Sequence, residues 1–370
     1  MNLYEPKSNY KICVYGIAKN ESKFVNRFMD ALEEIKEHVY ILDTGSTDDT
    51  MDLFRKRGAK IQQKHYDNFN FDVARNDSLN LVPEDYDVCV CLDIDEIIQK
   101  GFVGIINKLW SDDTTQMEYP TYYTVDNNGN PIQQFMNNKI HSRKNFKWIY
   151  PIHEVLEYTG NNPNVIETQE ILVIHKPDLN KERNFYLNLL EKRVENFPDD
   201  SRNLLLLTRE YNSYGRYDEC IKTAHKFLDL NINYAPQRVQ AMCYLANSYK
   251  GLKMYEEAEM WTDKALEETE VTREIYLQKI LIGFEKKNYE EVIKNAYEAL
   301  KIKEYNKRVI DSPACWNGTI YDYMSLAYYY LQDYDNAIKY VDLTIDQNPD
   351  IERLKENRKI FINEKNKKSC

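Results

Sequence analysis

Hydrophobic and polar positions in the first hundred residues predict strands that alternate with helices. Four apolar, β-favouring runs indicate strands, at residues 10–18, 39–43, 59–64 and 89–92. The segments after the first three runs are predicted as helices, over 22–35, 49–58 and 71–81. Ser22 is a candidate N-cap for the first helix. Strands that alternate with helices are typical of α/β domains with a mostly parallel sheet.

Acidic and amide side chains follow three of these strands where each strand ends. They are Asn20 and Glu21, then Asp43, and finally Asp93, Asp95 and Glu96. Unpaired carboxylates are not carried into a core, so we expect the last three acids at the carboxyl end of their strand. Open α/β sheets bind ligands at that edge. Asp93 and Asp95 stand at alternate positions and would repel each other without a cation, which predicts a metal site.

The segment 43–48 has the composition of a phosphate-binding turn, with hydroxyls and a glycine before a predicted helix. It lacks the Gly-Lys-Ser/Thr of a P-loop, and the chain has no Gly-x-Gly-x-x-Gly fingerprint there. Kinase-type and dehydrogenase-type functions are therefore disfavoured. For Thr47, Asp48 and Asp49 the favoured interpretation is capping of the following helix.

A different pattern begins after Glu96. A helix is predicted over 101–110, and apolar segments at 117–125 and 132–140 flank Asn128-Gly129, a strong hairpin signal. Antiparallel strands are expected up to residue 176. His175 ends the last of them, and an imidazole beside a carboxylate suits Mn²⁺ better than carboxylates alone. For His141, a hydrogen-bonded core or surface role is favoured.

Composition narrows the classes of protein. The 370 residues can build two domains, and the net charge of −11 argues against non-specific binding to nucleic acid. No segment approaches the roughly 18 apolar residues of a membrane span, and the N-terminus lacks an apolar signal core, so we expect a cytoplasmic protein. The seven cysteines lie mostly in apolar runs and are expected to be buried thiols.

The second half of the chain repeats one phrase four times. Each phrase begins with a tyrosine followed by acidic and small apolar residues, at Tyr217, Tyr255, Tyr289 and Tyr334. The period is 34 residues with insertions, as in tetratricopeptide repeats, and a curved solenoid is predicted over 181–358. It would hold a peptide or protein, or a second subunit. We expect the repeats to be interrupted by an insertion at 303–317 and followed by a flexible tail at 359–370. Residues 1–180 are expected to form a separate domain.

Seven motifs of the first half occur in an order that resembles family 2 glycosyltransferases of the GT-A fold. They are residues 16–21, 43–48, 69–76 and 92–96, then Trp148, the pair His153 and Glu154, and His175. The resemblance covers about residues 10–180 and is closest to a branch with a helical-repeat tail, which includes the sublancin-type peptide S-glycosyltransferases. It implies a GT-A, Rossmann-like domain, a nucleotide-diphospho-sugar donor, with UDP the family default, a divalent cation, Mn²⁺ or Mg²⁺, and inversion at the anomeric carbon.

The resemblance also implies roles for individual residues. The base and ribose would lie near Ala18, Asn20, Glu21 and Asp43, with Arg75 and Asn76 facing the donor. Asp93 would contact ribose or sugar hydroxyls, and Asp95 would bind the metal with His175 as a further ligand. Where many relatives have a Glu-Asp pair, this chain has His153-Glu154. Either residue is a candidate base, or Glu154 binds a sugar hydroxyl without a catalytic role.

These expectations lead to one favoured function and two alternatives. The favoured function is a hexosyl- or N-acetylhexosaminyltransferase that acts on a peptide or protein held partly by the repeats. The first alternative is the same chemistry on a lipooligosaccharide or cell-wall glycan. The second is a tetratricopeptide scaffold whose nucleotide-sugar domain is degenerate.

Overall fold

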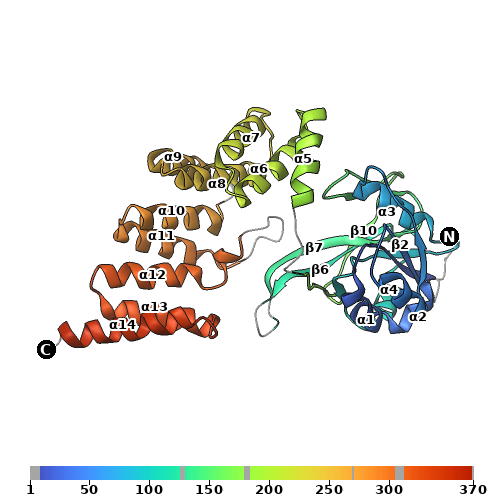
Figure 1. Cartoon of the computed structure of the whole chain (residues 1–370), viewed down its shortest axis with the longest axis horizontal. Coiled ribbons are helices and arrows are strands. Elements are labelled where there is room, and N and C mark those ends of the chain that lie inside the picture. The colour runs from blue at the N-terminus through green and yellow to red at the C-terminus, as the bar shows by residue number, and fades with distance from the viewer. Residues whose placement is uncertain are drawn as a thin grey trace, which may run out of the picture. The chain divides into compact units, whose positions relative to one another are not determined.

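The computed structural model describes residues 9–125, 129, 131–178, 184–268, 271–304 and 312–368. The chain forms two compact units, Met1–Glu182 and Arg183–Cys370 (Figure 1). The first unit is an α/β domain of Rossmann-like type, and the second is a helical repeat domain. The fold class predicted from the sequence is therefore confirmed.

The first unit is built on one mixed sheet with nine strands among the described residues. The strands pair in the order β3-β2-β1-β4-β7-β6-β11-β5, and β10 pairs with β6. Their bounds are β1 Ile12–Ala18, β2 Val39–Asp43, β3 Lys60–Gln63, β4 Val88–Cys91, β5 Glu96–Ile98, β6 Gln116–Val125, β7 Pro131–Ser142, β10 Val165–Glu167 and β11 Val173–His175. A separate antiparallel pair consists of β8 Phe146–Ile149 and β9 Val155–Tyr158.

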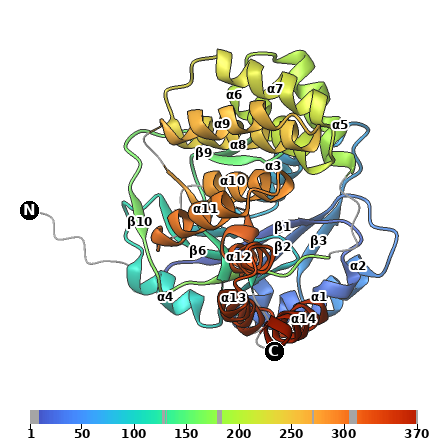
Figure 2. The same ribbon diagram turned by 90° about the vertical axis from the view of Figure 1, so that its left-hand side faces the viewer.

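Helices cover both faces of this sheet, because its central strands are apolar on both sides. The helical segments are α1 Ser22–Ala31, the 3₁₀ helix η1 Glu33–His38, α2 Thr50–Lys56, α3 Phe71–Asn80 and α4 Phe102–Leu109. Helices α1, α2 and α4 contribute Phe28, Phe54 and Phe102 to the core that contains Val14 and Val90 of the sheet. Helix α3 packs on the opposite face, which both views show (Figures 1 and 2).

Strand direction agrees with the prediction in the first part of the sheet only. Strands β1 to β4 are parallel, and β7 runs antiparallel to both β4 and β6. The expectation of antiparallel strands up to residue 176 is wrong for β10 and holds only in part for β11. Both run parallel to β6, and β11 runs antiparallel to β5. Between β7 and β10 the chain forms the β8–β9 pair, so it re-enters the sheet from the other end. The alternation of apolar and polar residues within a strand does not show the route of the chain between strands, and so it does not predict strand direction.

The start of α1 also differs from the prediction. Ser22 is the first helical residue, and its amide donates to Asp48 Oδ2 at 3.2 Å. The amide of Glu21 donates to Thr50 Oγ1 at 2.8 Å. The loop before α2 therefore caps α1 from 26 residues further along the chain. Asp48 has the capping role that was favoured for it, though part of that role is on a different helix.

Gly16 permits the close approach of β1 to the segment that follows β4. A Cβ atom at this position would lie 2.5 Å from the carbonyl oxygen of Leu92, a backbone atom that cannot move aside alone. We expect Gly16→Ala to lower the free energy of unfolding by about 1–3 kcal/mol, because β4 must shift. Urea denaturation of the purified chain measures this change.

The matched control is Gly104→Ala in α4, where no atom lies within 4 Å of an added Cβ. Alanine is the better helix former, so this variant should gain about 0.5–1 kcal/mol. Equal stability of the two variants would contradict the close-approach argument.

The second unit consists of antiparallel helix pairs. Its α-helices are α5 Asn184–Asn196, α6 Ser201–Ser213, α7 Tyr217–Asp229, α8 Ala235–Gly251, α9 Tyr255–Leu266, α10 Arg273–Glu285, α11 Tyr289–Lys301, α12 Thr319–Tyr330, α13 Tyr334–Gln347 and α14 Glu352–Lys368. The four repeated tyrosines are the first residues of α7, α9, α11 and α13. Each is therefore at the same place in a helix pair, as the period predicts.

The turn inside each pair is also repeated. Two residues before each tyrosine the backbone is left-handed, with φ of 69°, 62°, 58° and 62° at Gly215, Lys253, Lys287 and Gln332. The next amide donates to the carbonyl five residues earlier, for example Arg216 to Tyr211 at 2.9 Å. This is the Schellman closure of a helix, and it ends the first helix of every pair in the same way.

The expected flexible tail at 359–370 is helical as far as Lys368 and belongs to α14. Apolar residues explain the difference, since Phe361 is 2% exposed and stacks on Tyr329 with ring centres 4.9 Å apart. The predicted insertion at 303–317 lies partly outside the described residues. Its end is attached to α10, where Arg273 Nη1 donates to Cys315 O at 2.9 Å.

Candidate functional site

The carboxyl ends of β1, β2 and β4 meet at one edge of the sheet, and the predicted polar residues lie there. Asn20 follows β1 in a left-handed conformation with φ of 55°. Its side-chain oxygen accepts from Thr47 N at 2.8 Å, and its own amide donates to Ser46 Oγ at 2.8 Å. Ala18 O accepts from Thr44 N at 2.8 Å. Asn20 and Ala18 thus hold the loop 43–48 in place.

Asp43 is fully buried at the end of β2 and has one unused oxygen. Its Oδ1 accepts three hydrogen bonds, from the amides of Gly45 and Ser46 and from Gln63 Nε2, at 3.0, 2.9 and 2.8 Å. Its Oδ2 has no hydrogen-bond partner within the described structure. Buried polar atoms in native proteins nearly always have a partner, so Oδ2 is a candidate ligand atom.

Arg75 connects three of the predicted residues or their neighbours. It is 3% exposed; Nε donates to Glu154 Oε1 at 2.8 Å, Nη2 to Asp93 Oδ1, and Nη1 to the thiol of Cys91 at 3.4 Å. Burial disfavours the charged guanidinium, but Asp93 and Glu154 outweigh it and raise the pKa of Arg75 well above its ordinary value. Arg75 is therefore a permanent cation between the candidate donor ligand and the candidate base.

Lys139 on β7 is a second cation at Asp93, and the sequence analysis did not assign it. Its Nζ lies 3.0 Å from Asp93 Oδ2 and 3.4 Å from Glu96 Oε1. Burial by itself raises the pKa of Asp93, but Arg75 and Lys139 outweigh burial and hold that pKa far below its ordinary value. Asp93 is thus neutralised by side chains, so the repulsion expected between Asp93 and Asp95 is relieved without a shared cation.

Glu96 was expected at the strand end together with Asp93 and Asp95. Its side chain is instead buried. It is 5% exposed on β5, and its Oε2 accepts from the amide of Asp93 at 2.9 Å. Burial raises the pKa of Glu96 above its ordinary value. Its contacts make it a support for the turn that carries Asp93.

Asp95 and His175 form a pair at the same edge. His175 Nε2 lies 3.3 Å from Asp95 Oδ2, and its Nδ1 lies 3.3 Å from the carbonyl oxygen of Tyr123. The Tyr123 ring stacks on the imidazole at 4.6 Å and 13°. A hydrogen bond from Nδ1 to a carbonyl leaves Nε2 as the ligand nitrogen. Burial lowers the pKa of His175, and the hydrogen bond and charge of Asp95 more than reverse this shift.

The pair Asp95 and His175 suits a divalent cation as part of a larger ligand set. One carboxylate and one imidazole match the preferences of Mn²⁺. Among the residues that the structure describes, no three His, Cys, Asp or Glu side chains are grouped as a complete metal site. A site of this kind takes its remaining ligands from substrate phosphates and water.

Asn76 and His153 each have a structural feature that was not predicted from the sequence. Asn76 exchanges two hydrogen bonds with the backbone of Trp148, at 2.8 and 2.9 Å, and so ties α3 to β8. His153 has a left-handed backbone with φ of 49°, directly before Glu154. Such a conformation costs energy in a residue with a side chain and is frequent at functional sites.

His141 is a core residue. It is fully buried, with Nε2 2.9 Å from the Tyr15 hydroxyl and Nδ1 2.8 Å from Ser142 O. Burial lowers the pKa of His141 to about 4, so the ring is neutral. The favoured interpretation of this histidine is confirmed.

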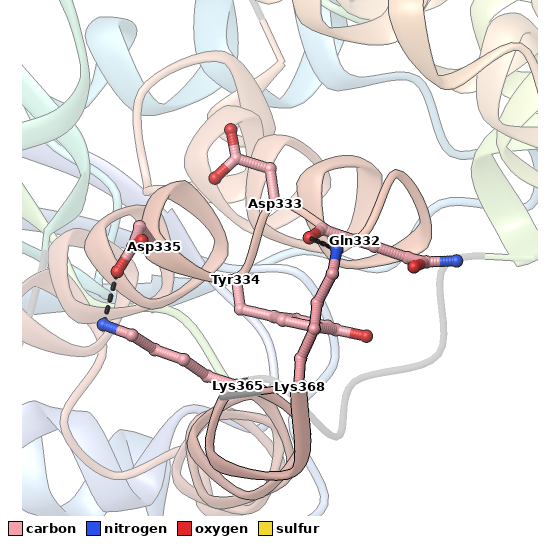
Figure 3. Close-up of a pocket in the computed structure, with 6 residues that line it drawn as sticks. All are labelled: Gln332, Asp333, Tyr334, Asp335, Lys365 and Lys368. Atoms are coloured by element: carbon pink, nitrogen blue, oxygen red, sulfur yellow. Dashed lines mark hydrogen bonds and ion pairs between the residues drawn. The ribbon is translucent and has the colours of Figure 1, made fainter. Parts of the chain in front are cut away.

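The repeat unit has a hollow of its own, with a volume of about 410 Å³. Its lining comes from the turn before α13, the start of α13, and α14: Gln332, Asp333, Tyr334, Asp335, Lys365 and Lys368 (Figure 3). Lys365 pairs with Asp335, and Lys368 donates to the carbonyl of Gln332 at 3.3 Å. These lysines are engaged with their own neighbours, and the hollow contains none of the residues predicted for catalysis.

Comparison with known proteins finds a family match in the first unit. Residues 13–162 match the model of the family described as glycosyl transferase family 2, which supports a nucleotide-sugar glycosyltransferase domain in the first unit. No curated protein matches the chain. Within the described part of the chain, every helix is too short or too polar to cross a bilayer.

Solved structures similar to the chain include tetratricopeptide repeat proteins. The MamA protein is 16% identical, with a TM-score of 0.36, over 45% of this chain and 82% of its own. YrrB, a tetratricopeptide protein, is 14% identical with a TM-score of 0.37, over 48% and 84%. A tetratricopeptide protein of Thermus thermophilus is 15% identical with a TM-score of 0.36, over 48% and 88%.

Proposed function

We propose that this protein is a metal-dependent, inverting glycosyltransferase that uses a UDP-sugar. The observation that carries the proposal is the pair Asp95 and His175, 3.3 Å apart, next to Asp93 at the carboxyl edge of the sheet. The family match over residues 13–162 supports the same chemistry. Mn²⁺ or Mg²⁺ held by Asp95 and His175 would stabilise the charge of the departing nucleoside diphosphate.

Asp43 is the proposed contact for the donor base. Its buried Oδ2 accepts no hydrogen bond from the described protein, and a carboxylate oxygen of this kind needs an N–H or O–H donor. Uracil presents an N–H at the ring position between its two carbonyls, whereas cytosine has an acceptor there. This difference favours a uridine donor over a cytidine donor.

Glu154 is the proposed base on the acceptor side. Inversion in a single displacement needs a group that takes the acceptor proton, and Glu154 is a carboxylate that shares Arg75 with Asp93. The left-handed His153 fixes the backbone before it. Arg75 thereby sets the spacing between the proposed base and the proposed sugar ligand.

The acceptor is proposed to be a peptide or protein, held partly by the helical repeats. Stacked repeats form extended concave surfaces that suit such ligands. Intact mass spectrometry of proteins co-expressed with this chain tests the class of acceptor. A mass increment of one hexose or N-acetylhexosamine on a polypeptide supports a peptide or protein acceptor. The same increment on a lipooligosaccharide or cell-wall glycan would replace this part of the proposal.

Calorimetry and a hydrolysis assay test the donor chemistry. UDP should bind in the presence of Mn²⁺ and more weakly after chelation, and UDP release from UDP-glucose or UDP-N-acetylglucosamine should depend on the metal. CDP is the matched ligand control and should bind more weakly than UDP. If the folded chain binds neither nucleotide, the scaffold alternative replaces the enzyme.

Metal affinity should fall in mildly acidic solution. Asp95 raises the pKa of His175 in the metal-free protein, and Mn²⁺ binds only the neutral imidazole. Affinity should therefore decrease by up to about tenfold per pH unit as pH falls below that pKa. Calorimetric titration with Mn²⁺ and UDP between about pH 6 and 8 covers this window. A His175→Gln variant should show a weaker dependence, because only the titration of the UDP phosphate remains, and an identical profile in both proteins would contradict the prediction.

A further inference from the structure

Five charged side chains form a row of alternating sign beneath the strand ends. Glu154 pairs with Arg75, Arg75 with Asp93, Asp93 with Lys139, and Lys139 with Glu96. The five come from different parts of the domain, namely α3, β5, β7, the turn after β4 and the residue before β9. The row has two cations for three carboxylates, so each cation serves two acids.

Asp93 is the centre of this row, and a cation holds each of its oxygens. Arg75 binds Oδ1, and Lys139 Nζ lies 3.0 Å from Oδ2. The backbone is fixed as well, because the Asp93 amide donates to Glu96 Oε2 at 2.9 Å. The Asp93 side chain nevertheless keeps 35% of its surface exposed, so a ligand hydroxyl can reach its remaining lone pairs.

Lys139 holds the second oxygen of a carboxylate that Arg75 already contacts. Arg75 is 4% exposed and is shared between Asp93 Oδ1 and Glu154, so Lys139 both balances charge in the row and fixes the Asp93 side chain. The Lys139 side chain is 18% exposed and lies on the other oxygen. With both oxygens held, the carboxylate cannot turn about its Cβ–Cγ bond. Preorganisation of this kind strengthens binding of a hydroxyl that must meet one lone pair.

We propose that Lys139 is a positioning residue for the sugar of the donor, acting through Asp93. The inference rests on the proposed function, because it takes Asp93 as the ligand of a sugar hydroxyl. Lys139 would then matter for the sugar and little for the nucleotide, which is bound through Asp43 and the metal pair. Its effect is specific to one part of the donor, and a purely structural role would not have that property.

The test uses two dissociation constants, both measured by calorimetry with Mn²⁺. The dissociation constant of the nucleotide sugar, UDP-glucose or UDP-N-acetylglucosamine, is divided by that of UDP. In Lys139→Met the ratio should rise about tenfold or more over the wild type, because a charged contact to Asp93 is lost. UDP affinity should stay within about twofold. Lys139→Arg keeps a cation at this position, so its ratio should lie close to the wild-type value.

Lys139→Met leaves Glu96 buried without its cation, so a second variant guards against misfolding. The double variant Lys139→Met with Glu96→Gln removes one charge of each sign and should show the same rise in the ratio. Lys108→Met is the control, since Lys108 forms an exposed pair with Glu170 at 2.9 Å. An unchanged ratio in the folded double variant would overturn the inference. Absence of UDP binding in the wild type would instead overturn the proposed function.

Discussion

Asp95→Asn should abolish metal-dependent turnover while leaving the fold intact. Asparagine keeps the shape of the side chain but removes the charge that the cation and His175 both use. Metal stabilisation of a leaving diphosphate contributes several kcal/mol, so the rate of UDP release should fall roughly a thousandfold. Stability should change little, because the Asp95 side chain is 27% exposed and its partner is a histidine.

The assay is UDP release from UDP-glucose or UDP-N-acetylglucosamine at saturating Mn²⁺, with urea denaturation as the check on folding. Asp52→Asn is the matched control, because Asp52 pairs with Arg55 on the exposed surface of α2. Turnover of Asp95→Asn within tenfold of the wild type would remove Asp95 from the metal site. Loss of activity in Asp52→Asn would show that the assay reports general damage.

Local patterns were sufficient to predict the elements that carry the site. The apolar runs that became β1, β2 and β4 end at the residues that meet at the sheet edge, and a strand reveals its end through its own sequence. The repeated tyrosines likewise marked the first residues of four helices, because the period of a repeat is also visible in the sequence. The first signal spans a few residues, and the second recurs along the chain with a period of 34 residues.

Contacts between distant segments could not be predicted in the same way. Lys139 reaches Asp93 because β7 pairs with β4 in a register that places Ile140 opposite Val90. Asp48 caps the helix that begins at Ser22 for a similar reason. Strand pairing and loop paths decide such contacts, and one sequence without relatives contains no measure of either. The sequence shows that residue 139 is a lysine, but it does not show which carboxylates that lysine contacts.

The predicted roles of Arg75 and Asn76 show the same limit within the site. Both lie on α3, and the resemblance implies that both face the donor. In the structure Arg75 is enclosed by Asp93 and Glu154, and Asn76 binds the backbone of Trp148. The motif therefore showed that both residues belong to the site. The fold shows that Arg75 holds Asp93 and Glu154, and that Asn76 holds the backbone of Trp148.

Arg75→Met should destabilise the first unit more than any other single substitution in the site. The variant leaves Asp93 with one cation and Glu154 with none, although both carboxylates stay where the fold places them. Removing one partner of a buried ion pair costs about 3–5 kcal/mol, because the other charge remains without compensation. Urea denaturation should show this loss at neutral pH.

The pH dependence of the variant provides a second measurement. Arg75 and Lys139 lower the pKa of Asp93 in the folded state, so Asp93 contributes stability above its unfolded pKa that is lost as pH falls through acid values. Without Arg75 this acid-induced loss should be smaller. The double variant Arg75→Met with Glu154→Gln should regain part of the stability, because one unpaired charge is removed.

Arg55→Met is the control for loss of an arginine. Arg55 is 55% exposed and pairs with Asp52 one turn away, so its removal should change stability by less than about 0.5 kcal/mol. If Arg75→Met were also within about 1 kcal/mol of the wild type, the row of charges would not hold Asp93 and Glu154 together. A large loss confined to Arg75→Met, partly restored by Glu154→Gln, would establish that one guanidinium joins the proposed sugar ligand to the proposed base.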